Sequence, residues 1–249
     1  AFTSTGTAPI VGTYGYCPIA LGTFVSANTN NVWYGSGDSS IAGLNDTTSI
    51  VAAGAGAFQR ALWDTGANNR IIAGLNFSRA GGTVLSVTQA VGDVMAYWAQ
   101  FASYGVDSWG FNSFTTSGTT TVAATALTQM QGLWTKYHAR GLTKIIKLKQ
   151  PQYTSSTDGW ATEANQTVPA GWASGGNVDT YHGLVTGRVG IDFDVNLPTP
   201  GWRGTDPFKY AAGGTSDGVT PKTAPSLLVG IELRTSMDSQ AGVVTDSTP

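Results

Sequence analysis

Short apolar runs alternate with longer segments of helical periodicity along most of this chain, and this alternation limits its possible folds more than any other feature. The runs with the length of buried strands are residues 31–36, 70–78, 106–112 and 143–151. The segments between them, residues 47–65, 85–105 and 121–141, repeat apolar residues at the spacing of one helix face. Strands that alternate with helices predict an open, mostly parallel α/β sheet.

The pattern continues toward the C-terminus, with a helix expected in residues 181–190, a strand in 191–196 and a last helix around 224–235. The length of 249 residues suits one large domain. We expect residues 31–249 to form that domain and residues 1–30, rich in Thr, Gly and Ala, to pack on it as a short β extension. The polar segment 150–181 is longer than plain connections usually are, so it predicts a functional loop.

Composition excludes several classes of partner. Charged residues make up 11% of the chain and its net charge is −2, so it offers no basic field for nucleic acid or an anionic membrane. No apolar stretch reaches the roughly 18 residues of a membrane span. Two features bear on metal binding. Cys17 is the single cysteine, which excludes a cysteine zinc cluster.

Residues 192–196, DFDVN, begin like a calcium loop. Leu197 and Arg203 stand where that loop needs glycine and glutamate, so a calcium loop is not expected. We expect no metal and no cofactor.

In a parallel α/β sheet the loops at the carboxyl ends of the strands converge, so chemistry is expected there. Ser39 follows the first strand on a tight turn into a helix, where free amides favour a developing oxyanion. Gly81 follows the second strand and offers a backbone amide, and Asn112 follows the third and offers a side-chain amide. A nucleophile and its oxyanion donors are thus predicted to meet at one edge. The simpler alternative is that Ser39 caps a helix and that Gly81 and Asn112 stabilise turns.

These residues, in this order, resemble the sequence blocks of the SGNH, or GDSL-like, hydrolase family over roughly residues 31 to 235. The matching positions are Gly37, Asp38, Ser39 and Gly43 in the first block, Asn76, Ser78, Gly81 and Thr83 in the second, Gly110 and Asn112 in the third, and Asp217 in the fourth. Family members are mostly esterases and acyl hydrolases on a flavodoxin-like, three-layer α/β/α sheet. The resemblance implies that Ser39 is the nucleophile and that Ser39, Gly81 and Asn112 hold the oxyanion. The aspartate that commonly follows the third-block asparagine is Ser113 here.

The fourth block, SDGVTPK, departs from the family at a position that matters for catalysis. Asp217 stands where the resemblance puts the orienting aspartate, but Thr220 stands where it puts the catalytic histidine. A serine hydroxyl is a weak nucleophile until a base takes its proton, and threonine does not accept a proton at neutral pH. Of the other candidates, His138 is expected to be structural, at the opposite edge of the sheet. His182 repeats the Asp-x-x-His spacing with Asp179 and is the alternative base.

Aromatic residues in the loops bear on the substrate. Trp109, Trp160, Trp172 and Trp202 lie in or beside strand-end loops rather than at helical spacing. Indole rings with polar neighbours can stack on sugar faces, although ordinary packing beneath loops is the alternative for each of them. We expect Trp109, Trp160 and Trp172 to bind the substrate, which would be a small ester or an acetylated polysaccharide.

Two functions from different classes remain open. The first is a carbohydrate O-acetyl esterase that is slow or inactive because position 220 holds threonine. The second is a catalytically silent carbohydrate-binding or structural module of a phage tail or surface protein, which keeps the pocket and lacks the base. In both cases we expect an extracellular, surface or virion-associated location.

Overall fold

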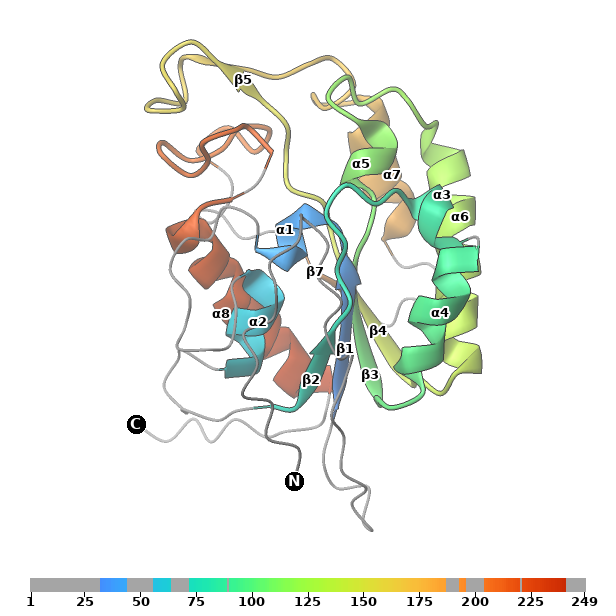
Figure 1. The fold of residues 1–249 in the computed structure, drawn as a ribbon. Helices are drawn as coiled ribbons and strands as arrows, with labels where there is room; N and C mark the ends of the chain where they lie inside the picture. Colours follow the sequence, from blue (N-terminus) through green and yellow to red (C-terminus); the bar gives the residue numbers. More distant parts are fainter. Residues whose placement is uncertain are drawn as a thin grey trace, which may run out of the picture.

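A five-stranded sheet forms the centre of the protein, in a computed structural model that describes residues 32–43, 56–63, 72–88, 90–186, 193–195, 204–219 and 221–240. The strand order is β2-β1-β3-β4-β7, and every pairing is parallel. The strands are β1 (Trp33–Gly37), β2 (Gly74–Asn76), β3 (Tyr104–Ser108), β4 (Lys144–Leu148) and β7 (Phe193–Val195) (Figure 1). This is the flavodoxin-like order, and it confirms the predicted fold class.

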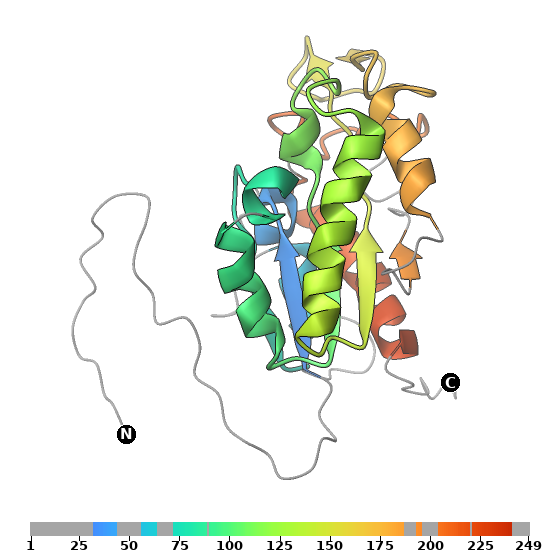
Figure 2. The same ribbon diagram turned by 90° about the vertical axis from the view of Figure 1, so that its right-hand side faces the viewer.

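Helices cover both faces of the sheet. One face carries α1 (Ser39–Ala42), α2 (Ala57–Trp63) and α8 (Thr223–Gln240). The other carries α3 (Val84–Thr88), α4 (Ala90–Ala99), α5 (Phe111–Phe114), α6 (Ala123–Ala139) and α7 (Asn177–Val185). Figure 2 shows α4 and α6 in front of the sheet, running roughly along the strands. Because the chain leaves β1 toward one face and β3 toward the other, the crevice between their carboxyl ends is the topological switch point of the fold.

Alternation along each strand fills a core on both faces. Trp33 and Ile146 belong to the core beneath α2 and α8, whereas Tyr34 and Ile145 belong to the core beneath α4 and α6. All four side chains are 0% exposed. Strands buried on both faces need continuous apolar runs, which is why these strands were predictable from the sequence.

A buried ion pair lies at the carboxyl ends of β3 and β4. Lys147 Nζ is 3.3 Å from Asp107 Oδ2, and both side chains are 0% exposed. Asp107 also accepts hydrogen bonds from the Trp109 amide (3.0 Å) and from Trp134 Nε1 (2.8 Å). Lys147 Nζ donates in turn to the Trp109 carbonyl (2.6 Å). The pair therefore fixes the turn that leaves β3 and attaches α6 to that turn through Trp134.

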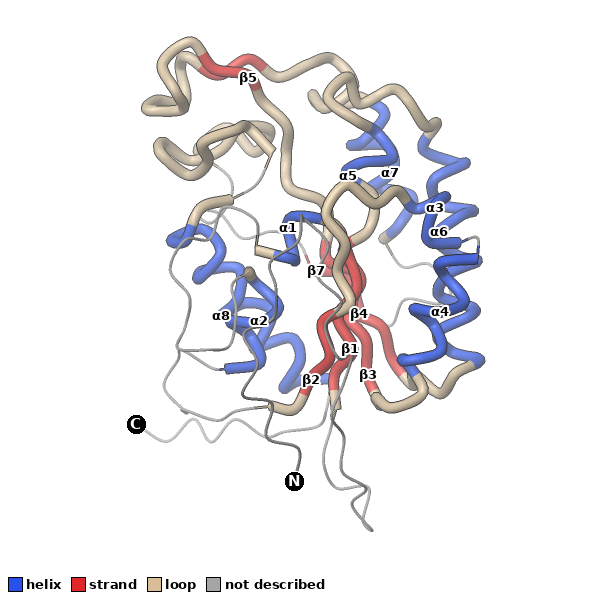
Figure 3. The backbone as a smooth tube through the Cα atoms, viewed as in Figure 1, coloured by secondary structure: helices blue, strands red, loops and turns tan. Residues whose placement is uncertain are grey.

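Two loops form a lobe beyond the carboxyl ends of the strands, at the top of Figure 3. One loop carries the hairpin of β5 (Ser155–Ser156) and β6 (Gln166–Thr167), and the other spans residues 204–219. Glu163 joins them, because its Oε2 accepts hydrogen bonds from the amide (3.0 Å) and the hydroxyl (2.8 Å) of Thr205. Burial acts to raise the pKa of Glu163, but the bonds from Thr205 and from the Asp206 amide outweigh it and lower the pKa.

The predicted β extension over residues 1–30 lies outside the described residues, so the predicted domain boundaries stay predictions. Among the helices that the structure describes, none combines the length and hydropathy that crossing a bilayer requires. The described ranges also contain no group of histidine, cysteine, aspartate and glutamate side chains arranged to bind a metal ion.

We predict that Lys147→Met lowers the free energy of unfolding by about 3–5 kcal/mol, because it leaves the Asp107 carboxylate buried without its counter-charge. Adding Asp107→Asn should recover part of that loss, since asparagine removes the buried charge and keeps the acceptor for the Trp109 amide; the recovery is partial because the acceptor for Trp134 Nε1 is lost. Urea denaturation of both variants and the parent protein measures this. A double variant less stable than Lys147→Met alone would contradict the assignment.

The stability of the protein should also fall above pH 10. Burial raises the pKa of Tyr34, Tyr137 and Tyr210, and each hydroxyl donates a hydrogen bond, to Met95 O, Ser36 Oγ and Val219 O respectively. The unfolded chain releases these protons near pH 10 while the folded chain keeps them, so unfolding becomes more favourable as pH rises, by up to about 1.4 kcal/mol per pH unit for each tyrosine. Absorbance at the tyrosinate band should show these rings titrating only as the protein unfolds. Ionisation of all nine tyrosines near pH 10 in the folded protein would contradict this.

Candidate active site

Ser39 lies at the carboxyl edge of the sheet, just after strand β1. All five residues of β1 are buried, and the chain turns directly into α1, of which Ser39 is the first residue. The Ser39 side chain is 7% exposed. Gly37 allows the turn, because a Cβ there would lie 2.4 Å from Ile41 Cγ2. Only one turn of helix is described after Ser39, so support for an oxyanion would come from first-turn amides rather than from a long helix dipole.

The carboxylate of Asp38 joins the first block to the third. Its side chain is 0% exposed, and its Oδ2 accepts a hydrogen bond from the Phe111 amide at 3.1 Å. Phe111 is the first residue of α5, directly after the turn that leaves β3. The bond therefore spans the switch point between β1 and β3.

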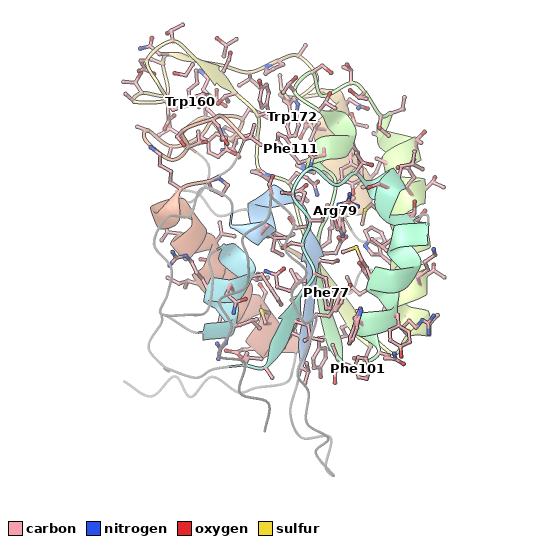
Figure 4. All side chains as sticks on the ribbon, in the orientation of Figure 1. Phe77, Arg79, Phe101, Phe111, Trp160 and Trp172 are labelled. Carbon is pink, nitrogen blue, oxygen red and sulfur yellow. The ribbon has the colours of Figure 1, made fainter. Side chains whose placement is uncertain are left out.

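The second block lies alongside β1. After β2 the chain continues in the same direction, so that the Phe77 amide donates to Gly35 O and the Arg79 amide donates to Gly37 O, both at 2.7 Å (Arg79 is labelled in Figure 4). Gly81 follows with a φ of 75° on an exposed turn, and no atom lies within 4 Å of the position its Cβ would take. The space beside the Gly81 Cα is therefore empty, and the turn lies at the surface.

Asn112 connects the third block to the second. Its Nδ2 donates to Gly82 O at 3.1 Å, and the neighbouring Ser113 Oγ accepts the Val84 amide at 2.9 Å. A primary amide has two N–H groups, so the bond to Gly82 orients Asn112 while a second N–H can serve another acceptor. Hydrogen bonds thus bring the first three predicted blocks together at one corner of the sheet.

Asp217 of the fourth block lies in an exposed turn of the 204–219 loop. Its Oδ1 accepts hydrogen bonds from the Val219 amide (2.8 Å) and the Thr215 hydroxyl (3.0 Å). Gly218 has a φ of 70°, and a Cβ there would lie 1.8 Å from Thr154 O, so glycine is required. Thr220 lies outside the described residues, and the expected contact between Asp217 and residue 220 stays a prediction.

A buried tyrosine anchors the backbone of the fourth block. Tyr210 is 0% exposed, and its hydroxyl donates to Val219 O at 2.6 Å. Burial raises the pKa of this hydroxyl well above its ordinary value, and the negative charges of Asp217 and Asp38 raise it further. The Tyr210 hydroxyl is therefore protonated and donates to the fourth block at neutral pH.

Gln166 in turn fixes the backbone of Tyr210. Its Nε2 donates to Tyr210 O (2.9 Å), and its Oε1 accepts from the Tyr210 amide (3.0 Å) and from Thr154 Oγ1 (3.1 Å). Gln166 is 4% exposed, although it lies in a polar stretch of the sequence. Sequence analysis missed both Gln166 and Tyr210, because a glutamine and a tyrosine in polar loops carry no signal that they are buried.

The structure corrects the prediction for two tryptophans. Trp109 is 0% exposed and Trp172 is 3% exposed, and both belong to the core beneath α6. The ring of Trp172 packs 4.9 Å from that of Phe111, and its Nε1 donates to Thr115 O. Packing therefore takes up all of Trp109 and nearly all of Trp172, so neither offers a ring face on which a sugar could stack. Trp202 lies outside the described residues.

Trp160 remains partly exposed in the lobe (Figure 4). Its φ is 63°, and its Nε1 donates to Thr154 Oγ1 at 2.9 Å. The ring lies against Gly218, since a Cβ on that glycine would meet Trp160 Cζ2 at 2.8 Å. Trp160 is thus the predicted aromatic residue that lies next to the fourth block.

The two histidines of the sequence occupy opposite ends of the sheet. His138 Nδ1 lies 2.7 Å from Leu142 O at the end of α6, just before β4 begins, so it stands at the amino ends of the strands. His182 Nε2 lies 3.3 Å from Gln150 Oε1, after the carboxyl end of β4. The structural role expected of His138 fits this position.

Comparisons with known proteins agree on the fold. No family model and no curated protein matches the sequence. Among solved structures, the esterase EstA from Pseudoalteromonas sp. aligns with a TM-score of 0.57 and 12% identity, over 86% of this chain and 100% of that chain. The acetyl-xylooligosaccharide esterase Axe2 from Geobacillus stearothermophilus aligns with a TM-score of 0.57 and 14% identity, over 88% of this chain and 97% of that one. The chain has the fold of these esterases.

Further structures in this group extend the comparison. A protein from Parabacteroides merdae described as a GDSL-like lipase aligns with a TM-score of 0.55 and 16% identity, over 86% of this chain and 96% of that one. Two others are catalytic mutants of Axe2, in which alanine replaces a histidine in one and an aspartate three positions earlier in the other. The predicted SGNH-like architecture is therefore supported by structures that share little sequence with this chain.

We predict that Tyr210→Phe lowers the free energy of unfolding by about 1–2 kcal/mol, because Val219 O loses its donor. Amide hydrogen exchange should become faster in peptides covering residues 211–219 and stay unchanged in β1 and β3. Tyr97→Phe, at an exposed ring, is the matched control and should change neither quantity. Equal exchange in Tyr210→Phe and the parent protein would show that the hydroxyl does not hold this loop.

Proposed function

We propose that this chain is an SGNH-type serine ester hydrolase that acts on O-acetyl esters of carbohydrates. The observation that supports the proposal is the set of hydrogen bonds that joins the first three blocks, from Arg79 to Gly37, from Phe111 to Asp38 and from Asn112 to Gly82. The hydroxyl of Ser39 would attack the acyl carbon. The amides of Ser39 and Gly81, with the side chain of Asn112, would hold the oxyanion, where such donors contribute most to the rate.

Asp217 and residue 220 would supply the acid–base part of the mechanism. The Asp-x-x-His positions of the two Axe2 mutants have the spacing of Asp217 and Thr220. With threonine at the second position, Ser39 has no general base of the usual kind, and a water bound by the hydroxyl is too weakly basic to replace it. Turnover would then come from the oxyanion donors and binding alone, and it would be slow.

Two kinds of observation favour an acetylated carbohydrate: the xylan-acting esterase among the structural neighbours, and a low charge that disfavours ionic substrates. Trp160 would supply the stacking surface near the fourth block. Trp109 and Trp172 no longer contribute to this argument, because both are buried.

One observation favours a second function. Position 220 holds threonine, which cannot act as the general base. This is expected of a protein that has kept the ligand-binding site of the fold and lost catalysis. The protein would then be a carbohydrate-binding or structural module of a phage tail or a surface protein. Both functions suit an extracellular, surface or virion-associated location.

The test is the rate of hydrolysis of a chromogenic acetyl ester by the parent protein, by Thr220→His and by Ser39→Ala. We expect slow or undetectable hydrolysis by the parent protein. Thr220→His should raise the rate by roughly 10² to 10⁴, the range expected of a positioned general base. Ser39→Ala is the blank, and Ser39→Ala combined with Thr220→His should abolish the gain.

Two other outcomes would point to a different function or to a different catalytic base. A Thr220→His protein that folds and stays inactive would favour the binding module over the hydrolase. Rapid turnover that is equal in the parent protein and in Thr220→His, and that is lost in Ser39→Ala, would show that another group is the base. His182 with Asp179 would then be the first pair to replace.

A further inference from the structure

A pocket separate from the predicted blocks opens beside the turn that leaves β3. It lies between the segment after β4, the start of α7 and the 204–210 part of the second loop. The lining residues that matter here are Gln150, Gln152, Trp172, Asp179, His182 and Phe208. None of them belongs to the residues that the sequence blocks assign to the ester chemistry.

Phe111 connects the pocket to the Ser39 corner, the part of the sheet edge where the first three blocks meet. The Phe111 amide binds Asp38 beside Ser39. The ring of Phe111 packs against Trp172, which lines the pocket (both are labelled in Figure 4). A Cβ on Gly110 would lie 2.8 Å from the side-chain amide of Gln150. A ligand in the pocket would therefore be linked to the turn that carries Asn112 through the side chains of Gln150 and Trp172.

The polar lining of the pocket is oriented from within the protein. Gln150 is 1% exposed, and its Nε2 donates to Trp109 O, the carbonyl that also accepts from buried Lys147. Because the Nε2 amide of Gln150 faces Trp109 O, its Oε1 faces His182, 3.3 Å from the imidazole Nε2. An amide oxygen only accepts hydrogen bonds, so the His182 Nε2 is the protonated ring nitrogen and donates in this contact. The ring of His182 is thus held at the pocket wall in a defined orientation.

The second loop supplies the opposite side of the pocket. Gln152 is 6% exposed, and its Nε2 donates to Lys209 O at 2.7 Å, which fixes the neighbouring Phe208 at the pocket. The Phe208 ring is partly exposed. An aromatic ring next to amide and imidazole groups suits a ligand with both a C–H face and hydroxyl groups.

The charges of the lining select against anions. Asp179 contributes a carboxylate, whose Oδ2 accepts the Gly175 amide at 2.9 Å. No lysine or arginine occurs among the described residues that line the pocket. A carboxylate acceptor without a nearby cation in the lining disfavours phosphates and carboxylates and accepts hydroxyl donors.

We infer that this pocket binds a neutral sugar ring, one pyranose unit of the carbohydrate, beside the site of ester cleavage. The inference rests on the proposed function for the identity of the ligand as a carbohydrate. The edge of the ring would bond to His182 and Asp179, and its C–H face would pack on Phe208.

The test is equilibrium binding by titration calorimetry, with unacetylated xylotetraose, cellotetraose and chitotetraose as probes, which carry no ester to cleave. We expect at least one probe to bind with a millimolar or lower dissociation constant. His182→Leu and Phe208→Ala should each raise that constant about 3- to 10-fold. His182→Gln, which keeps an N–H donor for Gln150 Oε1 and an acceptor for a sugar hydroxyl, should retain more affinity than His182→Leu.

Thr180→Ala, at an exposed position on the same helix α7, is the matched control and should leave binding unchanged. Ser39→Ala should also leave it unchanged, although it removes hydrolysis under the proposed function. Failure of all three probes to bind at about 10 mM would overturn the inference. So would a dissociation constant that neither pocket variant changes in proteins that are folded by circular dichroism.

The two proposals fail in distinguishable ways. Sugar binding that His182→Leu weakens, together with no hydrolysis by Thr220→His, would refute the esterase and leave the pocket assignment standing. Hydrolysis by Thr220→His, together with binding that His182→Leu and Phe208→Ala leave unchanged, would refute the pocket alone.

Discussion

The carboxyl edge of the sheet depends on the ion pair between Asp107 and Lys147. Both charges are buried, so each needs its partner and a full set of hydrogen bonds to offset the loss of water. The protein satisfies that need with the backbone of Trp109 and the indole of Trp134. The buried ion pair therefore holds the turn after β3 in place from the core side of the sheet. Asn112 and the link to Asp38 follow that one turn, and Phe111 connects the turn to Trp172 at the pocket.

The fold was predictable because buried parallel strands and amphipathic helices leave periodic patterns in the sequence. The positions of Ser39, Gly81 and Asn112 at strand ends followed from the same patterns, since the carboxyl ends of parallel strands share an edge. The tryptophans show where this reasoning fails. An indole in a loop sequence looks the same whether it stacks on a ligand or fills a gap beneath the loop, and Trp109 and Trp172 do the latter. Gln166 and Tyr210 were missed for the same reason.

The pocket and the Ser39 corner give the two candidate functions a common structural basis. A sugar held against Phe208 and His182 needs no general base, so binding in the pocket is independent of which residue occupies position 220. A hydrolase and a binding module would differ here by the presence of one proton acceptor rather than by a different arrangement of loops. The turn from Trp109 to Phe111 is the element that either function must keep.

The loop around position 220 is anchored on both sides. Gly218 O accepts the Thr154 amide, Val219 O accepts the Tyr210 hydroxyl, and Pro221 bridges to Thr215 while the Lys222 amide bonds to Gly214 O. These contacts involve main-chain atoms or residues other than 220, so none of them depends on the side chain that residue 220 carries. In evolutionary terms, a lineage could exchange the residue at this position and keep every one of these anchoring contacts.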